Sequence, residues 1–266
     1  MSRIVTNTNA NTVYKNYSRN QDALSTSMER LSTGLRINRA SDDPSGLAIS
    51  ETLRSQVKGT DAAVDVIANS SNFLNTVDGY LQTVHDMMGR MEELAVKMDD
   101  AVLTTSDKQN LANEFNALKS EVDNVFSSAK FNGSAIFGAA RTLAVDANGN
   151  EFTVGTDSLA ALAATSISTI SATSAATSSL SEINAAIGTI STQRASIGAD
   201  QSQLNYKSQA LQNYSENASA AESRIRNADM AKESSMFARN QILVQASTAM
   251  LSQANQSSQN VLSLLK

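Results

Sequence analysis

Residues 81–102 read LQTVHDMMGRMEELAVKMDDAV, and their apolar side chains fall at Leu81, Val84, Met88, Met91, Ala95, Met98 and Val102. The intervals alternate between three and four residues. This alternation is the 3.5-residue period of α-helices that interlock along an apolar seam. The segment therefore predicts a long helix that buries one stripe of its surface against other helices.

The same spacing recurs in residues 14–35, 111–129 and 180–225, and it resumes from Ile242 to Gln253. Aromatic residues make up only 5% of the chain and Trp is absent, so the core must consist of smaller apolar side chains, which suits helix-on-helix packing. A single proline in 266 residues permits long uninterrupted helices. We expect a mainly α fold, with long antiparallel helices in a rod-like bundle.

Two short breaks are expected to start helices. Asp43 followed by Pro44 is typical of a helix N-cap and first helical position. Residues 104–106 separate two apolar runs, and Ser106 is the expected cap of the helix that follows them.

After Lys130 the apolar period changes to two. Leu143 and Val145 alternate with polar neighbours before an Asn-Gly pair at residues 148–149, and Phe152 and Val154 alternate with polar neighbours after it. This pattern predicts a small β-hairpin in the middle of the chain. Residues 160–179, rich in Ala, Ser and Thr, are expected to form an exposed connection.

A chain that runs out in helices and returns in helices brings its two ends together. Residues 14–35 and 242–265 are thus expected to form an antiparallel pair. The pair is rich in Ala and poor in bulky residues, so it buries too little apolar area to offset its own ordering entropy. We therefore expect it to associate with neighbouring molecules, through apolar residues at Leu24, Met28, Leu31, Leu35, Ile242, Ala246, Ala249, Met250, Val261, Leu262 and Leu265.

Composition limits the other function classes. A net charge of −5 provides no basic stripe for nucleic acid or anionic lipid. No apolar stretch approaches the roughly 20 residues of a membrane span. The chain has no Cys, and its only His, His85, lacks both a zinc motif and a nucleophile elbow. We expect no catalytic, metal or cofactor site and no nucleic-acid or membrane partner.

Several motifs resemble those of bacterial flagellins. The N-terminal signature is similar in Leu31-Ser-Thr-Gly-Leu-Arg-Ile-Asn38 and Gly46-Leu-Ala-Ile-Ser50, and a further match is Lys130-Phe-Asn-Gly133. The C-terminal pattern is similar in Ser223-Arg-Ile-Arg-Asn-Ala-Asp229, Gln245-Ala-Ser-Thr-Ala-Met-Leu251 and Gln259-Asn-Val-Leu-Ser-Leu-Leu265. The resemblance covers roughly residues 1–138 and 180–266.

The resemblance implies a domain plan for a minimal flagellin without outer variable domains. Residues 1–42 and 227–266 would be the two halves of an inner-core helical domain. Residues 43–138 and 180–226 would form the outer-core helices, and residues 139–179 the β-hairpin and its connection.

The same resemblance implies a structural role and a set of partners. The chain would be a non-enzymatic subunit that self-assembles into the extracellular flagellar filament for motility. It would be secreted by the flagellar type III export apparatus with a flagellin chaperone. This route would explain why residues 1–20 lack the charged and apolar regions expected of a secretory signal. Filament cap and hook-associated proteins would be further partners.

Contact with the flagellin-sensing Toll-like receptor is implied by three positions, Arg90, Leu94 and Glu114, which match the receptor-contacting residues of the family. Arg90 and Leu94 are four residues apart and share one helix face. A turn at residues 104–106 would bring Glu114 near them. The alternative, that these residues form a solvated helix face with an ion pair, stays open.

Two other functions remain as alternatives. A hook–filament junction protein shares the terminal helices but does not form a long filament. A secreted effector or enzyme on a helical scaffold would need a reactive set of side chains, for which one His and no Cys leave little material.

Overall fold

The computed structural model describes residues 7–137, 141–144, 151–154 and 176–263. The chain forms two compact units, one of residues 1–55 with 217–266 and the other of residues 56–216. Both units are helical, as expected for a mainly α chain, and the long helices α2 (Pro44–Met98) and α5 (Ala176–Arg226) contribute to both of them. Helix α5 begins one turn before Leu180, the first residue of the apolar run.

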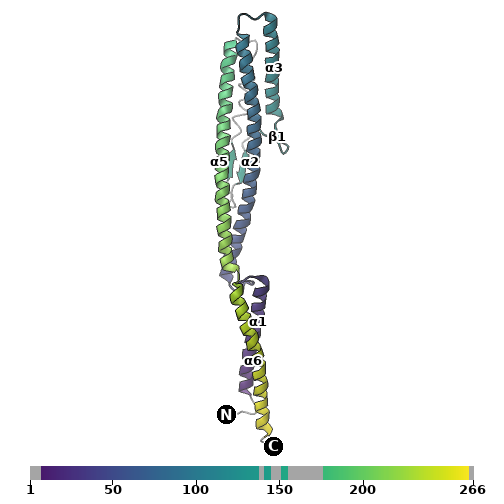
Figure 1. The fold of residues 1–266 in the computed structure, drawn as a ribbon, viewed down its shortest axis with the longest axis vertical. Helices are drawn as coiled ribbons and strands as arrows, with labels where there is room; N and C mark the ends of the chain where they lie inside the picture. The colour runs from purple at the N-terminus through teal and green to yellow at the C-terminus, as the bar shows by residue number, and fades with distance from the viewer. Residues whose placement is uncertain (1–6, 138–140, 145–150, 155–175, 264–266) are drawn as a thin grey trace. The chain divides into compact units, whose positions relative to one another are not determined.

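The unit of residues 56–216 has the larger apolar core. Helices α2 and α5 lie side by side, and α3 (Thr105–Ser128) packs beside α2 (Figure 1). The predicted seam of α2 is confirmed, because Leu81, Val84, Met88, Met91 and Ala95 are all buried. Val102 is an exception and is exposed, since α2 ends at Met98. The facing seams are buried at Phe115, Val122 and Ala129 of α3 and its C-cap, and at Ile183, Ile190, Ile197 and Leu204 of α5.

Polar contacts fix α5 antiparallel to α2. Arg194 Nε donates a hydrogen bond to Asp78 Oδ1 at 2.8 Å, and Gln201 Nε2 donates to Asn75 Oδ1 at 3.0 Å. Farther along, Ser215 Oγ donates to Asp61 Oδ1 at 2.9 Å. Residue numbers fall on α2 as they rise on α5, which is the pairing that the returning chain predicted.

Two small antiparallel hairpins follow α3. Strands β3 (Arg141–Ala144) and β4 (Glu151–Val154) pair with Leu143 opposite Phe152, which confirms the predicted hairpin. Its expected turn lies outside the described residues. Strands β1 (Lys130–Phe131) and β2 (Ser134–Ala135) form a second hairpin that the sequence analysis did not predict. Its turn holds Asn132 and Gly133 at φ of 50° and 78°, the left-handed geometry that an Asn-Gly pair favours.

Side chains cap the helix starts. Asp43 Oδ1 accepts a hydrogen bond from Gly46 N at 2.9 Å, so the predicted cap of α2 is confirmed. The expected Ser106 cap of α3 is wrong, because Thr104 holds that place. Thr104 Oγ1 accepts from Asp107 N, while Asp107 Oδ2 accepts from Thr104 N at 3.2 Å. The helix begins earlier because this reciprocal arrangement satisfies two backbone groups at once.

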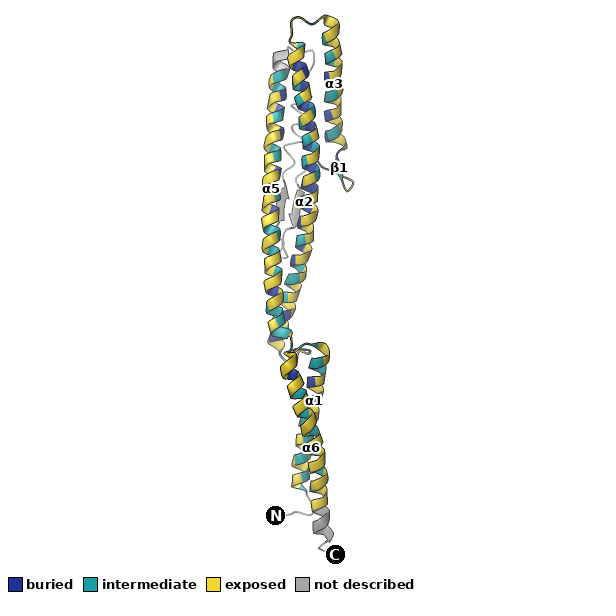
Figure 2. Ribbon diagram, in the orientation of Figure 1, coloured by how far each residue is buried: buried dark blue, intermediate teal, exposed yellow. Residues whose placement is uncertain are grey.

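The other unit contains the pair formed by α1 (Thr8–Thr33) and α6 (Met230–Ser263), which lie side by side in Figure 1. Asn7 Nδ2 donates to Ala254 O, and Asn20 Nδ2 donates to Ser247 Oγ, both at 3.2 Å. The expected antiparallel pairing of the two ends is therefore present. Figure 2 shows its sparse burial: most of both helices is half-buried or exposed, whereas α2 carries a regular buried stripe.

Asp200 places a carboxyl group in the apolar seam of α5. It lies between buried Ile197 and Leu204, and burial raises the pKa of its carboxyl above the ordinary value of 3.8. The folded chain thus binds this proton more tightly than the unfolded chain, and Asp200 lowers stability as the pH rises from 3.8 towards neutral. We expect Asp200→Asn to raise the melting temperature at pH 7, with the gain shrinking as the pH falls. Thermal denaturation followed by circular dichroism measures both effects.

Asp78→Asn is the matched control, because it removes the negative charge that pairs with Arg194 and weakens the hydrogen bond, and it should lower the melting temperature. An unchanged or lower melting temperature of Asp200→Asn at pH 7 would contradict the prediction.

Candidate assembly surface

The two helices of the terminal pair expose apolar side chains on faces turned away from each other. On α1, Tyr14 and Met28 are exposed two heptads apart. On α6, Ile242 is 65% exposed and Met250 is 58% exposed, with Leu243 also exposed. Single exposed apolar residues are ordinary, but a row of them at helical spacing marks a contact surface. We call Tyr14, Met28, Ile242, Leu243, Ala246, Ala249 and Met250 the outward stripe.

The residues of α6 that face α1 form a separate series. Asn240, Val244, Ser247, Leu251 and Ala254 are half-buried, and they repeat at intervals of three and four residues. Ile242, Ala246 and Ala249 are exposed instead and lie about half a turn away from that series, at 100° per residue. Helix α6 is thus apolar on two faces, which is typical of a helix that is surrounded in an assembly.

The eleven residues expected to act in assembly fall into three groups. Met28, Ile242, Ala246, Ala249 and Met250 are exposed. Leu24, Leu31 and Leu35 are half-buried, the first two on the face of α1 that contacts α6. Val261 and Leu262 belong to the last turns of α6, and Leu265 lies outside the described residues.

A short backbone bridge joins the chain segments at the start of the pair. Leu35 and Asn227 form an antiparallel β-bridge, in which Arg36 N donates to Arg226 O at 2.6 Å and Ala228 N donates to Gly34 O at 2.9 Å. Gly34 makes the approach possible, because it ends α1 in the left-handed region with a φ of 73°. The N-terminal motif of residues 31–38 and the C-terminal motif of residues 223–229 are therefore in direct contact.

Side chains reinforce the bridge. Arg36 Nη2 donates to Ile225 O at 2.7 Å, and Arg226 Nη1 donates to Glu51 Oε1 at 2.6 Å. In the adjoining loop, the Asp42 carboxylate accepts hydrogen bonds from the backbone N–H groups of Arg39 and Asn38. These hydrogen bonds lower the pKa of Asp42 below its ordinary value.

The second candidate site centres on Arg90 and Glu114. Arg90 Nη2 and Nε donate to Glu114 Oε1 at 2.8 and 3.0 Å, and Arg90 Nη1 donates to Glu93 Oε2 at 2.8 Å. The two carboxylates raise the pKa of Arg90. The turn between α2 and α3 thus brings Arg90 and Glu114 together, as expected. Leu94 does not join them on the surface: its exposed fraction is 0%, because it belongs to the buried core of this unit.

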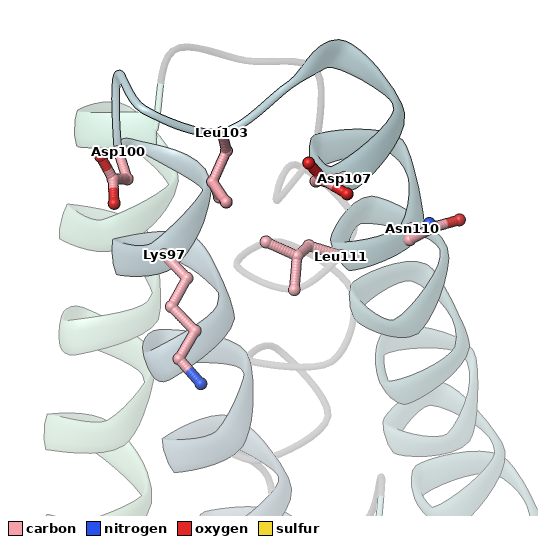
Figure 3. A pocket seen from close by; sticks show the side chains of 6 residues that line it. All are labelled: Lys97, Asp100, Leu103, Asp107, Asn110 and Leu111. Atoms are coloured by element: carbon pink, nitrogen blue, oxygen red, sulfur yellow. The ribbon is translucent and has the colours of Figure 1, made fainter.

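A hollow of about 400 Å³ lies where α2 gives way to α3 (Figure 3). Leu103 and Leu111 point into it, and Lys97, Asp100, Asp107 and Asn110 surround it. Among residues 7–137, 141–144, 151–154 and 176–263, no group of three or more His, Cys, Asp or Glu side chains could hold a metal ion. The two leucines make the inner wall of the hollow apolar.

His85, the only histidine, lies half-buried on α2. Its Nδ1 atom is buried and has no hydrogen-bond partner in the described part of the chain.

None of the described helices is long and apolar enough to cross a membrane.

These features define a helical protein that exposes apolar faces on its paired terminal helices, and comparison with known proteins gives its family. The model of the bacterial flagellin N-terminal helical region matches residues 4–142, and that of the C-terminal helical region matches residues 180–265. The chain belongs to the bacterial flagellin family.

Curated relatives agree with this membership. The chain is 39% identical to the flagellar filament 33 kDa core protein of Treponema phagedenis, over 90% of this chain and 91% of that protein. It is 35% identical to the flagellin of Bacillus subtilis (strain 168), over 94% and 95% of the two chains. A solved structure assigned as a flagellar hook-associated protein from Vibrio parahaemolyticus has a TM-score of 0.58 at 15% identity, covering 70% of this chain and 100% of that one. That likeness concerns the fold alone.

Gly34 allows a test of the bridge. Gly34→Ala places a Cβ in the left-handed region, and we expect it to lower the free energy of unfolding by about 1–2 kcal/mol. Gly34→Asn should lower it less, because Asn tolerates this conformation. Urea denaturation followed by circular dichroism compares the variants. Equal stability of wild type and Gly34→Ala would show that the bridge does not depend on this geometry.

Proposed function

We infer that the chain is a structural subunit of the bacterial flagellar filament and that its copies assemble through the outward stripe of α1 and α6. The observation that carries the inference is the exposure of Ile242 and Met250 on a helix that already packs its opposite face against α1. Covering these residues with a second copy removes apolar area from water at about 25 cal/mol per Å². One chain cannot supply that cover with its own terminal pair.

Several finer statements belong to the same proposal. The inner core comprises residues 1–42 and 227–266, and the outer core residues 43–138 and 180–226. The subunit reaches the outside of the cell through the flagellar type III apparatus, escorted by a flagellin chaperone, and meets the cap and hook-associated proteins there. It carries out no enzymatic reaction. Support comes from family membership and from a chain that lacks Cys and Trp and has sparsely buried terminal helices.

A hook–filament junction protein is the alternative, and electron microscopy of the purified chain separates the two. A filament subunit forms long filaments without other proteins, whereas a junction protein stays unpolymerised or forms short assemblies.

Charges on the outward stripe test the assembly surface. We expect Ile242→Asp and Met250→Asp each to raise the critical concentration for polymerisation more than about tenfold, because assembly would bury an unpaired carboxylate. Sedimentation of polymer across a concentration series measures this. Circular dichroism should show that the unit of residues 56–216 melts as in the wild type.

Gln241→Asp supplies the matched control, since Gln241 is an exposed polar residue of the same helix outside the stripe. It should polymerise normally. Normal polymerisation of both stripe variants would mean that copies do not contact one another through this face.

We also propose that Arg90 and Glu114 form the contact for the flagellin-sensing Toll-like receptor. An arginine held by two carboxylates on an exposed helix face is a preorganised group of the kind that dominates binding interfaces. Leu94 would contribute indirectly, as a core residue of the helix that carries Arg90. Since assembly would cover this outer-core face, recognition would act on the free subunit.

Arg90→Ala should lower the response of receptor-expressing reporter cells to monomer by about tenfold or more. Arg54→Ala is the control, since its ion pair with Glu51 is similarly exposed but lies elsewhere on α2. An unchanged response with normal polymerisation would leave Arg90 as part of a solvated helix face.

A further inference from the structure

The contact between α1 and α6 is unusual in what it buries. Among the described residues of the two helices, only Ser27 and Glu233 fall into the buried class, with exposed fractions of 4% and 5%. The larger apolar side chains of the contact, such as Leu24 and Leu251, are only half-buried. Polar side chains therefore occupy the least accessible part of this helix pair.

Apolar packing alone distinguishes poorly between alternative registers of this pair. Both inner faces repeat every seven residues, with Tyr17, Leu24 and Leu31 on α1 and Val244 and Leu251 on α6. Sliding one helix by seven residues again sets medium-sized apolar side chains opposite one another. In helix pairs of this kind, a buried polar group at a single position is what selects the register.

Arg30 and Glu233 supply such a group. Arg30 Nη1 lies 3.8 Å from Glu233 Oε2, and the Glu233 side chain is only 7% exposed. Arg30 Nε and Glu233 Oε1 are buried without a hydrogen-bond partner in the described part of the chain. The distance exceeds that of a hydrogen bond, so the pair is a poor source of net stability. Residue 23 is Ala and residue 37 is Ile, so a slip of one heptad in either direction would take the cation away from the buried carboxylate, which is strongly unfavourable.

We propose that the Arg30–Glu233 ion pair sets the register of α1 against α6 beyond the backbone bridge of Leu35 and Asn227. Asn7 with Ala254 and Asn20 with Ser247 make matching contacts in that register. A single register gives every copy the same arrangement of the outward stripe. This consequence rests on the proposed function, whereas the register is a property of the helix pair itself.

Disulfide trapping in the full chain tests the proposal, and the absence of native Cys makes it clean. Asn20→Cys with Ser247→Cys joins positions whose side chains are 3.2 Å apart in the observed register. Asn20→Cys with Ala254→Cys detects a slip of one heptad, because residue 254 lies seven residues beyond residue 247. In the observed register these two positions are offset by about 10 Å along the helix, which is too far for a disulfide. After mild oxidation, non-reducing gels quantify intramolecular bonds in the sedimented and unsedimented fractions separately.

With Arg30 and Glu233 intact, the yield of the disulfide between positions 20 and 247 should exceed that between positions 20 and 254, measured in the second variant, by about tenfold or more in at least one fraction. The paired change Arg30→Met with Glu233→Leu should bring the two yields to within about twofold of each other. The exposed pair at Arg39 and Glu29 provides the control. Arg39→Met with Glu29→Leu should leave the preference intact.

Charge reversal separates loss of the ion pair from failure to fold. Arg30→Glu or Glu233→Arg alone should abolish the preference, and the two together should restore it. The proposal is wrong if Arg30→Met with Glu233→Leu keeps the preference for the 20–247 disulfide, or if Arg30→Glu with Glu233→Arg does not restore it. It is also wrong if the chain with Arg30 and Glu233 unchanged shows no such preference in either fraction. A preference that follows these changes in a chain forming no sedimentable polymer would refute the assembly function while supporting the register pair.

Discussion

The shortage of apolar burial between α1 and α6 is the constraint on which the behaviour of this chain depends. In the unit of residues 56–216, large side chains such as Phe115 and Leu81 are fully buried, so three helices can hold one another within a single molecule. The terminal pair has no comparable core. Its apolar groups are divided between an inner face and an outward one, and only the inner face is covered within the chain.

Burial also divides the chain along its sequence. Residues that stabilise the single subunit lie in the middle of the chain, on α2, α3 and α5. The exposed apolar residues that we propose as the assembly surface lie on the terminal helices. The bridge between Leu35 and Asn227 ties the two ends of the chain together where the terminal pair begins. Two of the segments that resemble flagellin motifs, residues 31–38 and 223–229, thus share one physical role, since each provides half of that bridge.

The sequence predicted well where large apolar residues lie on one face only. Along α2, a single series from Leu81 to Ala95 carries the large residues, and that series is buried. On α6, periodicity identified a helix and an apolar face, but Ile242 and Val244 belong to opposite faces. Spacing alone cannot show which face is covered within the chain. Family resemblance likewise grouped Leu94 with Arg90, although a shift of only 40° around the helix moves a side chain from surface to core.

Short-range signals were the other weak point. Asn132-Gly133 is a strong turn pair, yet its strands contain only two residues each, too few to show an alternating pattern. Thr104 and Ser106 are both good caps, and the choice between them depends on whether Asp107 can bond back to the residue three positions earlier. Such local competitions are decided by geometry that composition does not reveal.

The capping side chains have a consequence for the order in which the chain folds. Asn7, Asp43, Thr104 and Asp229 each satisfy backbone N–H groups at the start of α1, α2, α3 and α6. The first turn is the slow step in helix growth, so these caps allow each helix to start from its own sequence before any partner arrives. Contacts within α2 and α3 close short loops, whereas Asn7 must meet a residue 247 positions away. Loop closure therefore delays the terminal pair most, so α1 and α6 are the last helices to meet as the chain folds.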